Sequence, residues 1–408
     1  MPRPTGPVGA WGNASSIEHA EAAAAMLRRI LPPDLLPFFG ASFIRSHLLY
    51  DEFVYRLALR VVQESGLEAA LQEPGSTEEI AARGKLEAGR ALVPLDWILR
   101  RLAAGGALAE VETTSRFCAR GPLPALDPAP VREEQLGHDS SWLPSYVVAE
   151  IAAREYPAFL RGEVAGEAVL FSPSRLPLWV DYFSNENGLY AVNNRVGAVA
   201  VEQWSPRAGG EVLELGGGLG SGALAVLEQL EAAGRLAAIG GYHFTELVPA
   251  FLRRGQRTLQ ARYPALGRLT FGTIDMNRSF AAQGIAPGRF SLVYAVNTLH
   301  VAHDLDFTLG EVLRALEPGG RLIACECVRP RPGQPIYAEF VFNLMETFRS
   351  PRLHALYRPG GGFLTPEQWR GAMERAGFVE IRCLPDISRI REEVSDFFVA
   401  AIGATRPG

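Results

Sequence analysis

The sequence contains very little lysine and cysteine. Lys85 is the only lysine among 40 basic residues, and the 408 residues include four cysteines, Cys118, Cys325, Cys327 and Cys383. Cys325 and Cys327 are two positions apart in an expected strand, so their side chains should point to opposite faces. The four cysteines form neither a disulfide framework nor a zinc quartet, and we expect reduced, buried thiols. The nearly exclusive use of arginine for positive charge is typical of a GC-rich genome.

Long apolar runs and a strong net charge are also missing. No run reaches the ~18 residues that a membrane helix requires. The first residues, MPRPTGPVGAWGN, lack the basic-then-apolar order of a secretory signal. We therefore expect a cytoplasmic protein without membrane contact. The formal net charge of −5 disfavours a general nucleic-acid binder.

The chain is long enough for more than one domain, and its pattern divides it into four segments. Residues 1–40 are expected to hold a leader and a first helix, and residues 41–130 a winged-helix-like domain for dimerisation or capping. Residues 131–206 follow as a helical linker and substrate cap. Residues 207–408 are expected to form the catalytic domain.

Local signals predict the winged helix. Ser76 and Glu79 match a capping box that begins a short helix. The helix expected over 92–106 ends in two glycines, as helices often do. Residues 107–119 then read as two strands joined by a polar tip at 112–116.

The charge of this region decides between its possible roles. Residues 48–125 contain nine basic and eleven acidic residues, a net charge of −2, whereas a DNA reader needs a basic stripe. We therefore expect dimerisation, as a possible homodimer, or coverage of a substrate. A cofactor-sensing regulator that binds DNA remains an alternative from another class of function. In residues 176–204, aromatic side chains interleave with amides, which suits a cap over an organic ligand or the core of a helix.

After residue 206, strands and helices alternate. The expected strands are 211–215, 238–247, 269–275, 291–297, 321–327, 379–385 and 397–404. The intervening helices predict an α/β fold with a doubly wound, mainly parallel, Rossmann-like sheet. The last two strands are joined by a short segment without a clear crossover, so the last strand should be antiparallel.

The stretch EVLELGGGLGSG, residues 211–222, places a glycine turn after the first of these strands. In a doubly wound sheet, ligands bind beyond the carboxyl end of this strand. Gly216, Gly218 and Gly220 allow positive φ and a close approach of the backbone to a ligand. Glu214 stands where a nicotinamide-binding turn more often has an apolar residue, and the spacing excludes a lysine-containing phosphate loop. An acid there suits a ligand that carries a cation.

Acids also follow the next two strands. Glu246 ends the second strand and is placed to accept hydrogen bonds from both hydroxyls of a ribose. Asp275 and Met276 follow the third strand, where a carboxylate can accept from an adenine amino group and a thioether can lie on the ring. Three acids at successive strand ends, with glycines at the first, fit adenosine plus an amino-acid head group. We therefore predict S-adenosylmethionine as the cofactor.

The chain resembles the class I S-adenosylmethionine-dependent methyltransferases over residues 207–404. The motifs that carry this resemblance are ELGGGLGSG, YHFTELVPAFLRRG, FGTIDMNRS, YAVNTLHVAHDL and LEPGGRLIACE. The resemblance implies a seven-stranded methyltransferase sheet. The residues expected to line the cofactor are Glu214, Gly216, Gly217, Gly218, Gly220, Glu246, Asp275, Met276 and Asn297.

A base for the reaction is expected at the ends of the fourth and fifth strands. His300 follows the fourth strand and Glu326 ends the fifth, so both should border the same crevice. A histidine hydrogen-bonded to a carboxylate holds one tautomer and becomes a stronger base. Methyl transfer from a sulfonium requires an aligned acceptor and removal of its proton. We therefore predict His300 as general base, Glu326 as its partner and Asn297 near the acceptor.

Two subfamilies of methyltransferase are similar to this part of the chain. Winged-helix small-molecule O-methyltransferases carry a histidine and a glutamate in similar places, although Val301 and Phe363 stand here where that group often has acids. Carbon-methylating domains of polyketide synthases carry phrases similar to NTLHVA. We expect methylation of a hydroxyl on a small natural-product-type acceptor. The alternative is α-carbon methylation of a carrier-tethered acyl thioester.

A metal is the remaining question at this site. His300, His303 and Asp304 are weak candidates for a metal site, because two histidines and an acid can form a facial triad. A polyketide-loading methyltransferase group that resembles this chain uses iron. We nevertheless expect no metal, and His303 is more readily explained as an exposed residue at a helix start.

Overall fold

The computed structural model describes residues 13–111, 115–204, 209–266 and 268–408. The chain forms two compact units that interleave along the sequence. Unit 1 comprises Met1–Arg29, Phe39–Tyr182 and Gly333–Arg349, and unit 2 comprises Ile30–Phe38, Phe183–Pro332 and Ser350–Gly408. The expected leader, most of the polar tip at 112–116 and the boundary at residue 206 lie outside the described residues.

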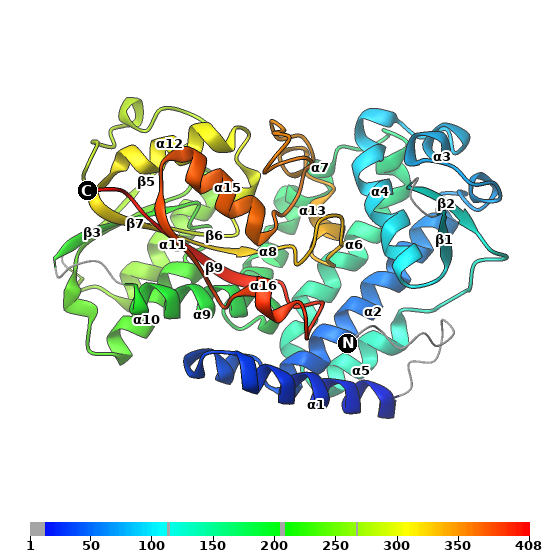
Figure 1. Cartoon of the computed structure of the whole chain (residues 1–408), viewed down its shortest axis with the longest axis horizontal. Coiled ribbons are helices and arrows are strands. Elements are labelled where there is room, and N and C mark those ends of the chain that lie inside the picture. Colours follow the sequence, from blue (N-terminus) through cyan, green and yellow to red (C-terminus); the bar gives the residue numbers. More distant parts are fainter. Residues whose placement is uncertain (1–12, 112–114, 205–208, 267) are drawn as a thin grey trace. The chain divides into compact units, whose positions relative to one another are not determined.

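Unit 2 is built on a seven-stranded sheet (Figure 1) with the order β5-β4-β3-β6-β7-β9-β8. Its strands are β3 (Gly210–Leu215), β4 (Ile239–Thr245), β5 (Leu269–Gly272), β6 (Phe290–Val296), β7 (Leu316–Cys327), β8 (Val379–Leu384) and β9 (Val399–Thr405). Strand β9 pairs antiparallel with both β7 and β8, whereas β3 to β7 pair in parallel. The predicted sheet with an antiparallel last strand is therefore confirmed.

Helices cover this sheet. The helices of unit 2 are α9 (Gly188–Gln203), α10 (Ser221–Ala232), α11 (Pro249–Arg262), α12 (Leu305–Ala315), α15 (Pro366–Ala376) and α16 (Ile387–Ile390). Helices α9 and α10 pack together, as do α12 and α15, and Figure 1 shows these pairs on opposite sides of the sheet. Because both faces are covered, all seven residues of β6 are buried, and such strands appear in the sequence as apolar runs.

Two strand boundaries differ from the prediction by three residues or more. The fifth strand was expected to begin at residue 321, but β7 begins at Leu316. The third strand was expected to continue to Asp275, but β5 ends at Gly272. The backbone N–H of Asp275 donates instead to the side chain of Gln283, at 2.8 Å. Asp275 and Met276 therefore lie in a loop that follows the strand by a few residues.

Unit 1 is mainly helical. Its helices are α1 (Asn13–Ile30), α2 (Ala41–Glu64), α3 (Thr77–Arg83), α4 (Ala88–Ala104), α5 (Ala129–His138), α6 (Leu143–Leu160), α7 (Gly166–Phe171), α8 (Leu176–Tyr182), α13 (Glu339–Phe342) and α14 (Glu346–Arg349). Strands β1 (Leu108–Val111) and β2 (Arg116–Ala119) pair antiparallel. The capping box of Ser76 and Glu79 is present at the start of α3, and Gly105 caps α4.

A segment distant in sequence completes the core of unit 1. The carbonyl of Ile336 accepts from the indole of Trp97 at 3.2 Å, and the carbonyl of Phe340 accepts from the hydroxyl of Tyr156 at 2.5 Å. Phe340 and Tyr156 are fully buried. The first part of the insertion between β7 and α15, Gly333–Arg349, thus contributes aromatic residues to the helical unit. Among the described residues, no helix is long and apolar enough to cross a membrane.

Candidate active site

The glycine turn after β3 has the backbone that its sequence predicts. Gly216 and Gly218 have φ angles of 61° and 58°, in the left-handed region that favours glycine. A Cβ on Gly216 would lie 2.5 Å from Cγ2 of Thr298, so this position has no room for a side chain. Around Gly218, by contrast, no heavy atom of the described residues, apart from Gly218 and its two chain neighbours, lies within 4 Å of the Cβ position. The turn is therefore tight on one side and has open space beside Gly218, as a ligand held against its backbone requires.

Glu246 follows β4 and faces this turn. Its carboxylate accepts the backbone N–H groups of Gly218 at 2.9 Å and Val248 at 2.7 Å. Burial raises the pKa of Glu246, and these two N–H donors oppose that change. The structure thus brings together the ends of β3 and β4, and it places the acid predicted to hold the ribose beside the glycines.

Glu214 lies inside the sheet rather than on the surface of the turn. Its side chain is 1% exposed and accepts a hydrogen bond from the hydroxyl of Tyr242 at 3.1 Å. Burial raises the pKa of Glu214 to about 8, although the Tyr242 hydrogen bond acts in the opposite direction. At neutral pH this carboxyl is mostly protonated. A direct ion pair with the cation of a ligand would require its ionisation, and its assignment to the cofactor remains a prediction.

The loop after β5 fixes the third predicted acid. Oδ1 of Asp275 accepts from the backbone N–H of Asn277 at 2.9 Å, and the carbonyl of Met276 accepts from the hydroxyl of Thr308 at 2.9 Å. Both residues are partly exposed. Since β5, β4 and β3 are parallel neighbours, this loop lies at the same edge of the sheet as the glycine turn.

His300 and Glu326 form a buried pair. Nδ1 of His300 lies 2.7 Å from Oε2 of Glu326, and the two residues are 4% and 0% exposed. The other oxygen, Oε1, accepts the backbone N–H groups of Thr298 at 3.2 Å and Leu299 at 2.9 Å. A buried carboxylate is costly unless such donors surround it. Three donors thus converge on the Glu326 carboxyl.

This pairing determines which nitrogen of the imidazole can act as a base. With the Nδ1 proton directed to Glu326, the lone pair of the neutral ring lies on Nε2. The ring also packs against Phe363, with 4.5 Å between centroids. Phe363 therefore supplies an apolar contact to the histidine rather than a second acid.

Asn297 connects β6 to its neighbour. It adopts a left-handed conformation with a φ of 47°, which is uncommon for a residue other than glycine. Its backbone N–H donates to the carbonyl of Cys325 at 2.8 Å, and its Oδ1 accepts from the N–H of Cys327 at 2.9 Å. The bend at Asn297 directs the following N–H groups toward Glu326.

Thr298 joins the two halves of the site. Its methyl group contacts the position of a Gly216 side chain, and its backbone N–H donates to Glu326. The glycine turn and the His300–Glu326 pair are therefore neighbours. Sequence reasoning gave no role to Thr298 or Tyr242, although both lie within the quoted motifs, because their contacts with Glu326 and Glu214 join separate strands.

The weak metal candidates have other partners. Asp304 accepts from the N–H of Phe307 at the start of α12 and pairs with Arg352 at 2.5 Å. The carbonyl of His303 accepts from the N–H of Arg352 at 2.7 Å. Within the described ranges, no group of three His, Cys, Asp or Glu side chains is arranged to hold a metal ion.

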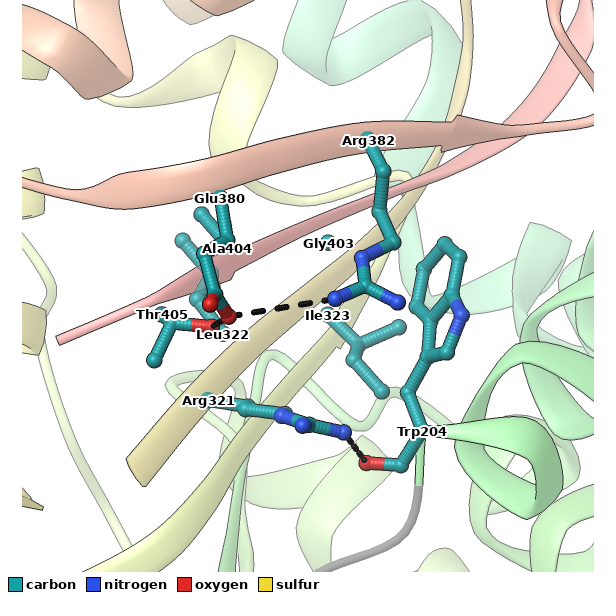
Figure 2. Close-up of a pocket in the computed structure, with 9 residues that line it drawn as sticks. All are labelled: Trp204, Arg321, Leu322, Ile323, Glu380, Arg382, Gly403, Ala404 and Thr405. Carbon is teal, nitrogen blue, oxygen red and sulfur yellow. Dashed lines mark hydrogen bonds and ion pairs between the residues drawn. The ribbon is translucent and has the colours of Figure 1, made fainter. Parts of the chain in front are cut away.

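A separate small pocket lies elsewhere on unit 2 (Figure 2). Its lining residues are Trp204, Arg321, Leu322, Ile323, Glu380, Arg382, Gly403, Ala404 and Thr405. Arg321 donates to the carbonyl of Trp204 at 3.0 Å, and Glu380 pairs with Arg382 at 3.8 Å. Arg321 precedes Glu326 by five residues along β7, roughly 17 Å at the usual rise of a strand. The pocket is therefore distinct from the candidate active site.

Comparisons with known proteins agree with this geometry. Residues 213–322 match a family model described as a methyltransferase domain. The chain is 30% identical over 253 residues to highly reducing polyketide synthase 2 of Gibberella zeae, covering 60% of this chain and 9% of that protein. It is 25% identical over 257 residues to polyketide synthase PksM of Bacillus subtilis, covering 61% and 6%. The chain thus spans less than a tenth of the length of these two relatives.

Solved structures share the fold over nearly the whole chain. The CurJ carbon methyltransferase matches with a TM-score of 0.74 and 20% identity, covering 96% of this chain and 99% of that one. The carbon methyltransferase domain of the citrinin polyketide synthase matches with a TM-score of 0.70 and 15% identity, covering 97% of each. The trans-methyltransferase CalH, solved with S-adenosylhomocysteine, matches with a TM-score of 0.57 and 18% identity, covering 88% and 91%.

The fold, the strand-end residues and the family match define a class of protein. The chain contains a methyltransferase domain that includes residues 213–322. Within that class, it is similar to the methyltransferase domains of polyketide synthases.

Proposed function

We propose that the protein methylates the α-carbon of an acyl thioester carried on a phosphopantetheine arm. The sequence alone placed hydroxyl methylation first and this reaction second. The order changes because the relatives described above are polyketide synthases, and two of the structures that share the fold are carbon methyltransferases. The observation that carries the chemistry is the buried His300–Glu326 pair beside the glycine turn.

The cofactor would be held by the residues predicted for it. Glu246 would accept the ribose hydroxyls, the space beside Gly218 would admit the methionine portion, and Asp275 and Met276 would contact the adenine. When bound, S-adenosylmethionine supplies a methyl group on a positively charged sulfur, and a neutral thioether departs.

The residues of the chain would handle the proton. Nε2 of His300 takes a proton from the α-carbon, and the electrons of that C–H bond pass into the thioester as an enolate. The α-carbon then forms a bond to the methyl carbon as the methyl–sulfur bond breaks. Glu326 stabilises the resulting imidazolium, which afterwards releases its proton to solvent. The acceptor must be in line with the methyl group, and the NH₂ group of Asn297 would orient its carbonyl.

A paired transfer assay tests this proposal. The full chain is given methyl-labelled S-adenosylmethionine with either a β-ketoacyl carrier protein or a set of hydroxylated aromatics, each with and without chelator. Label on the α-carbon is the expected result. Replacement of His300 by alanine should reduce that rate by ~10²–10⁴ while leaving the affinity for S-adenosylhomocysteine unchanged.

The other outcomes of the assay are equally informative. Label found only in alkali-stable methyl ethers would replace the proposal with the hydroxyl methyltransferase. Sensitivity to chelator would reopen the question of a metal near His300 and His303. A loss of only twofold in the His300→Ala variant would reduce His300 to a packing residue.

A further inference from the structure

Arg358 is a fully buried arginine near the candidate base. Its side chain is 1% exposed, and it lies in the segment between β7 and α15 that belongs to unit 2. Two backbone hydrogen bonds join it to His354: the N–H of each residue donates to the carbonyl of the other, at 2.9 Å in both cases. The site described above assigns no role to this residue, and no sequence motif marks it.

The guanidinium binds the turn that carries His300. Nη1 donates to the carbonyl of Ala302 at 2.7 Å, and Nη2 donates to the carbonyl of His300 at 2.5 Å. The same turn donates its N–H groups at Thr298 and Leu299 to Glu326. One buried carboxylate therefore holds the donors of the turn, and one buried guanidinium holds its acceptors.

Acidic neighbours favour the charged form of the Arg358 guanidinium. Burial lowers the pKa of Arg358 to about 10, and the charges of Tyr357, Asp304 and Glu326 act in the opposite direction. The group is therefore a cation at neutral pH. A rigid planar fork can bind two carbonyls at once, whereas the single ammonium of a lysine cannot reproduce that geometry.

We propose that Arg358 is a positioning residue for the general base: by binding the carbonyls of His300 and Ala302 it fixes the turn so that Nε2 of His300 points at the acceptor. This inference rests on the proposed function, because it requires His300 to remove a proton. Misplacement of a reacting group by about 1 Å can reduce a rate ~10²-fold. Loosening of this turn should therefore slow proton removal more than it affects binding.

Exchange of the α-proton measures the base alone. The full chain is incubated with a β-ketoacyl carrier protein and S-adenosylhomocysteine in deuterium oxide, so that protons exchange and no methyl group moves. Arg358→Lys keeps the charge and should reduce the exchange rate ~10-fold, and Arg358→Gln should reduce it further. In both variants the affinity for S-adenosylhomocysteine and the KM for the carrier protein should stay within twofold of wild type.

Arg352→Gln is the matched control. Arg352 lies in the same segment, but its side chain is mainly exposed and pairs with Asp304, so it does not touch the carbonyls of the turn. Its exchange rate should equal that of wild type. The melting temperature of each variant is recorded alongside.

Several results would overturn the proposal. Wild-type exchange in the Arg358→Lys variant would show that the fork does not position the base. A parallel loss of S-adenosylhomocysteine affinity, or failure of both variants to fold, would make Arg358 a residue of the fold only. If wild type exchanges no faster than the His300→Ala variant, the proposed function fails and this inference fails with it. If those two differ and Arg358→Lys matches wild type, the inference fails alone.

Discussion

Two strands of the sheet in unit 2 end in the same way, with a buried glutamate one position before the last residue. Glu214 occupies this position in β3 and Glu326 in β7, and the two are 1% and 0% exposed. In the described part of the chain, one donor, the hydroxyl of Tyr242, reaches the Glu214 carboxyl. Three donors reach Glu326. The two glutamates are alike in burial and differ in the number of donors that reach them.

The backbone after each strand explains the difference. After β3, the N–H groups of Gly217 and Gly218 donate to Thr245 and Glu246, so they do not reach Glu214. After β6, the left-handed bend at Asn297 turns the following N–H groups toward Glu326. The backbone N–H groups of the glycine turn are thus directed away from the Glu214 carboxyl.

Of the two buried glutamates and Glu246, we expect the largest effect on methyl transfer from replacing the carboxyl of Glu326 by an amide. In Glu326→Gln, the amide NH₂ would face either the Nδ1–H of His300 or the N–H groups of the turn, which are also donors. We expect kcat for methyl transfer to fall ~10²-fold, in the range observed when the partner of a catalytic group is lost. The affinity for S-adenosylhomocysteine, measured by calorimetry, should stay within twofold.

Glu380→Gln provides the control for this substitution, because Glu380 lies at the separate pocket and bonds only Thr405 and Arg382 among the described residues. Its kcat should match wild type. A Glu326→Gln variant with more than half of the wild-type kcat would remove the distinction between the two buried glutamates.

Glu246 has a smaller expected effect. It is 7% exposed, and the backbone N–H groups of Gly218, Leu247 and Val248 reach its carboxylate. In Glu246→Ala, the ribose hydroxyls lose their acceptor, and we expect the dissociation constant for S-adenosylhomocysteine to rise ~10–100-fold, as for a lost hydrogen bond to a charged group. Glu246→Asp, which keeps the charge on a shorter side chain, should bind more tightly than the alanine variant. An unchanged dissociation constant in Glu246→Ala would place the ribose elsewhere.

The framework of this site could be predicted from the sequence, since it depends on local patterns. Parallel strands buried on both faces appear as apolar runs, and the residues after them gather at one edge of the sheet. That rule alone placed His300 near Glu326, and the two are 2.7 Å apart. It misplaced the end of the third strand, because no turn signal separates Gly272 from Asp275.

The remaining partners depend on contacts between distant residues. Tyr242 reaches Glu214 across two neighbouring strands, and Arg358 reaches the carbonyl of His300 from 58 positions further along the chain. Neither contact leaves a periodic pattern in the sequence. The position of Gly333–Arg349 in the core of unit 1 could not be predicted from the sequence for the same reason. It depends on contacts between distant residues, such as the hydrogen bond from Tyr156 to the carbonyl of Phe340.

The last prediction concerns the pH dependence of stability through Glu214. The pKa of Glu214 is about 8 in the folded chain, above the ordinary value of 4.5. Between these values the unfolded chain has an ionised carboxylate while the folded chain keeps its proton, so stability falls as pH rises. Roughly 3 kcal/mol of folding stability is lost through this group between about pH 5 and pH 8.

The Glu214→Gln variant tests this expectation. Its side chain cannot ionise, so its stability relative to wild type should rise over that interval. Denaturant unfolding at both pH values measures the change, with Glu374→Gln, an exposed position on α15, as the control. If Glu214→Gln and wild type differ equally at both pH values, Glu214 is ionised in the folded chain, and the two buried glutamates are alike in charge.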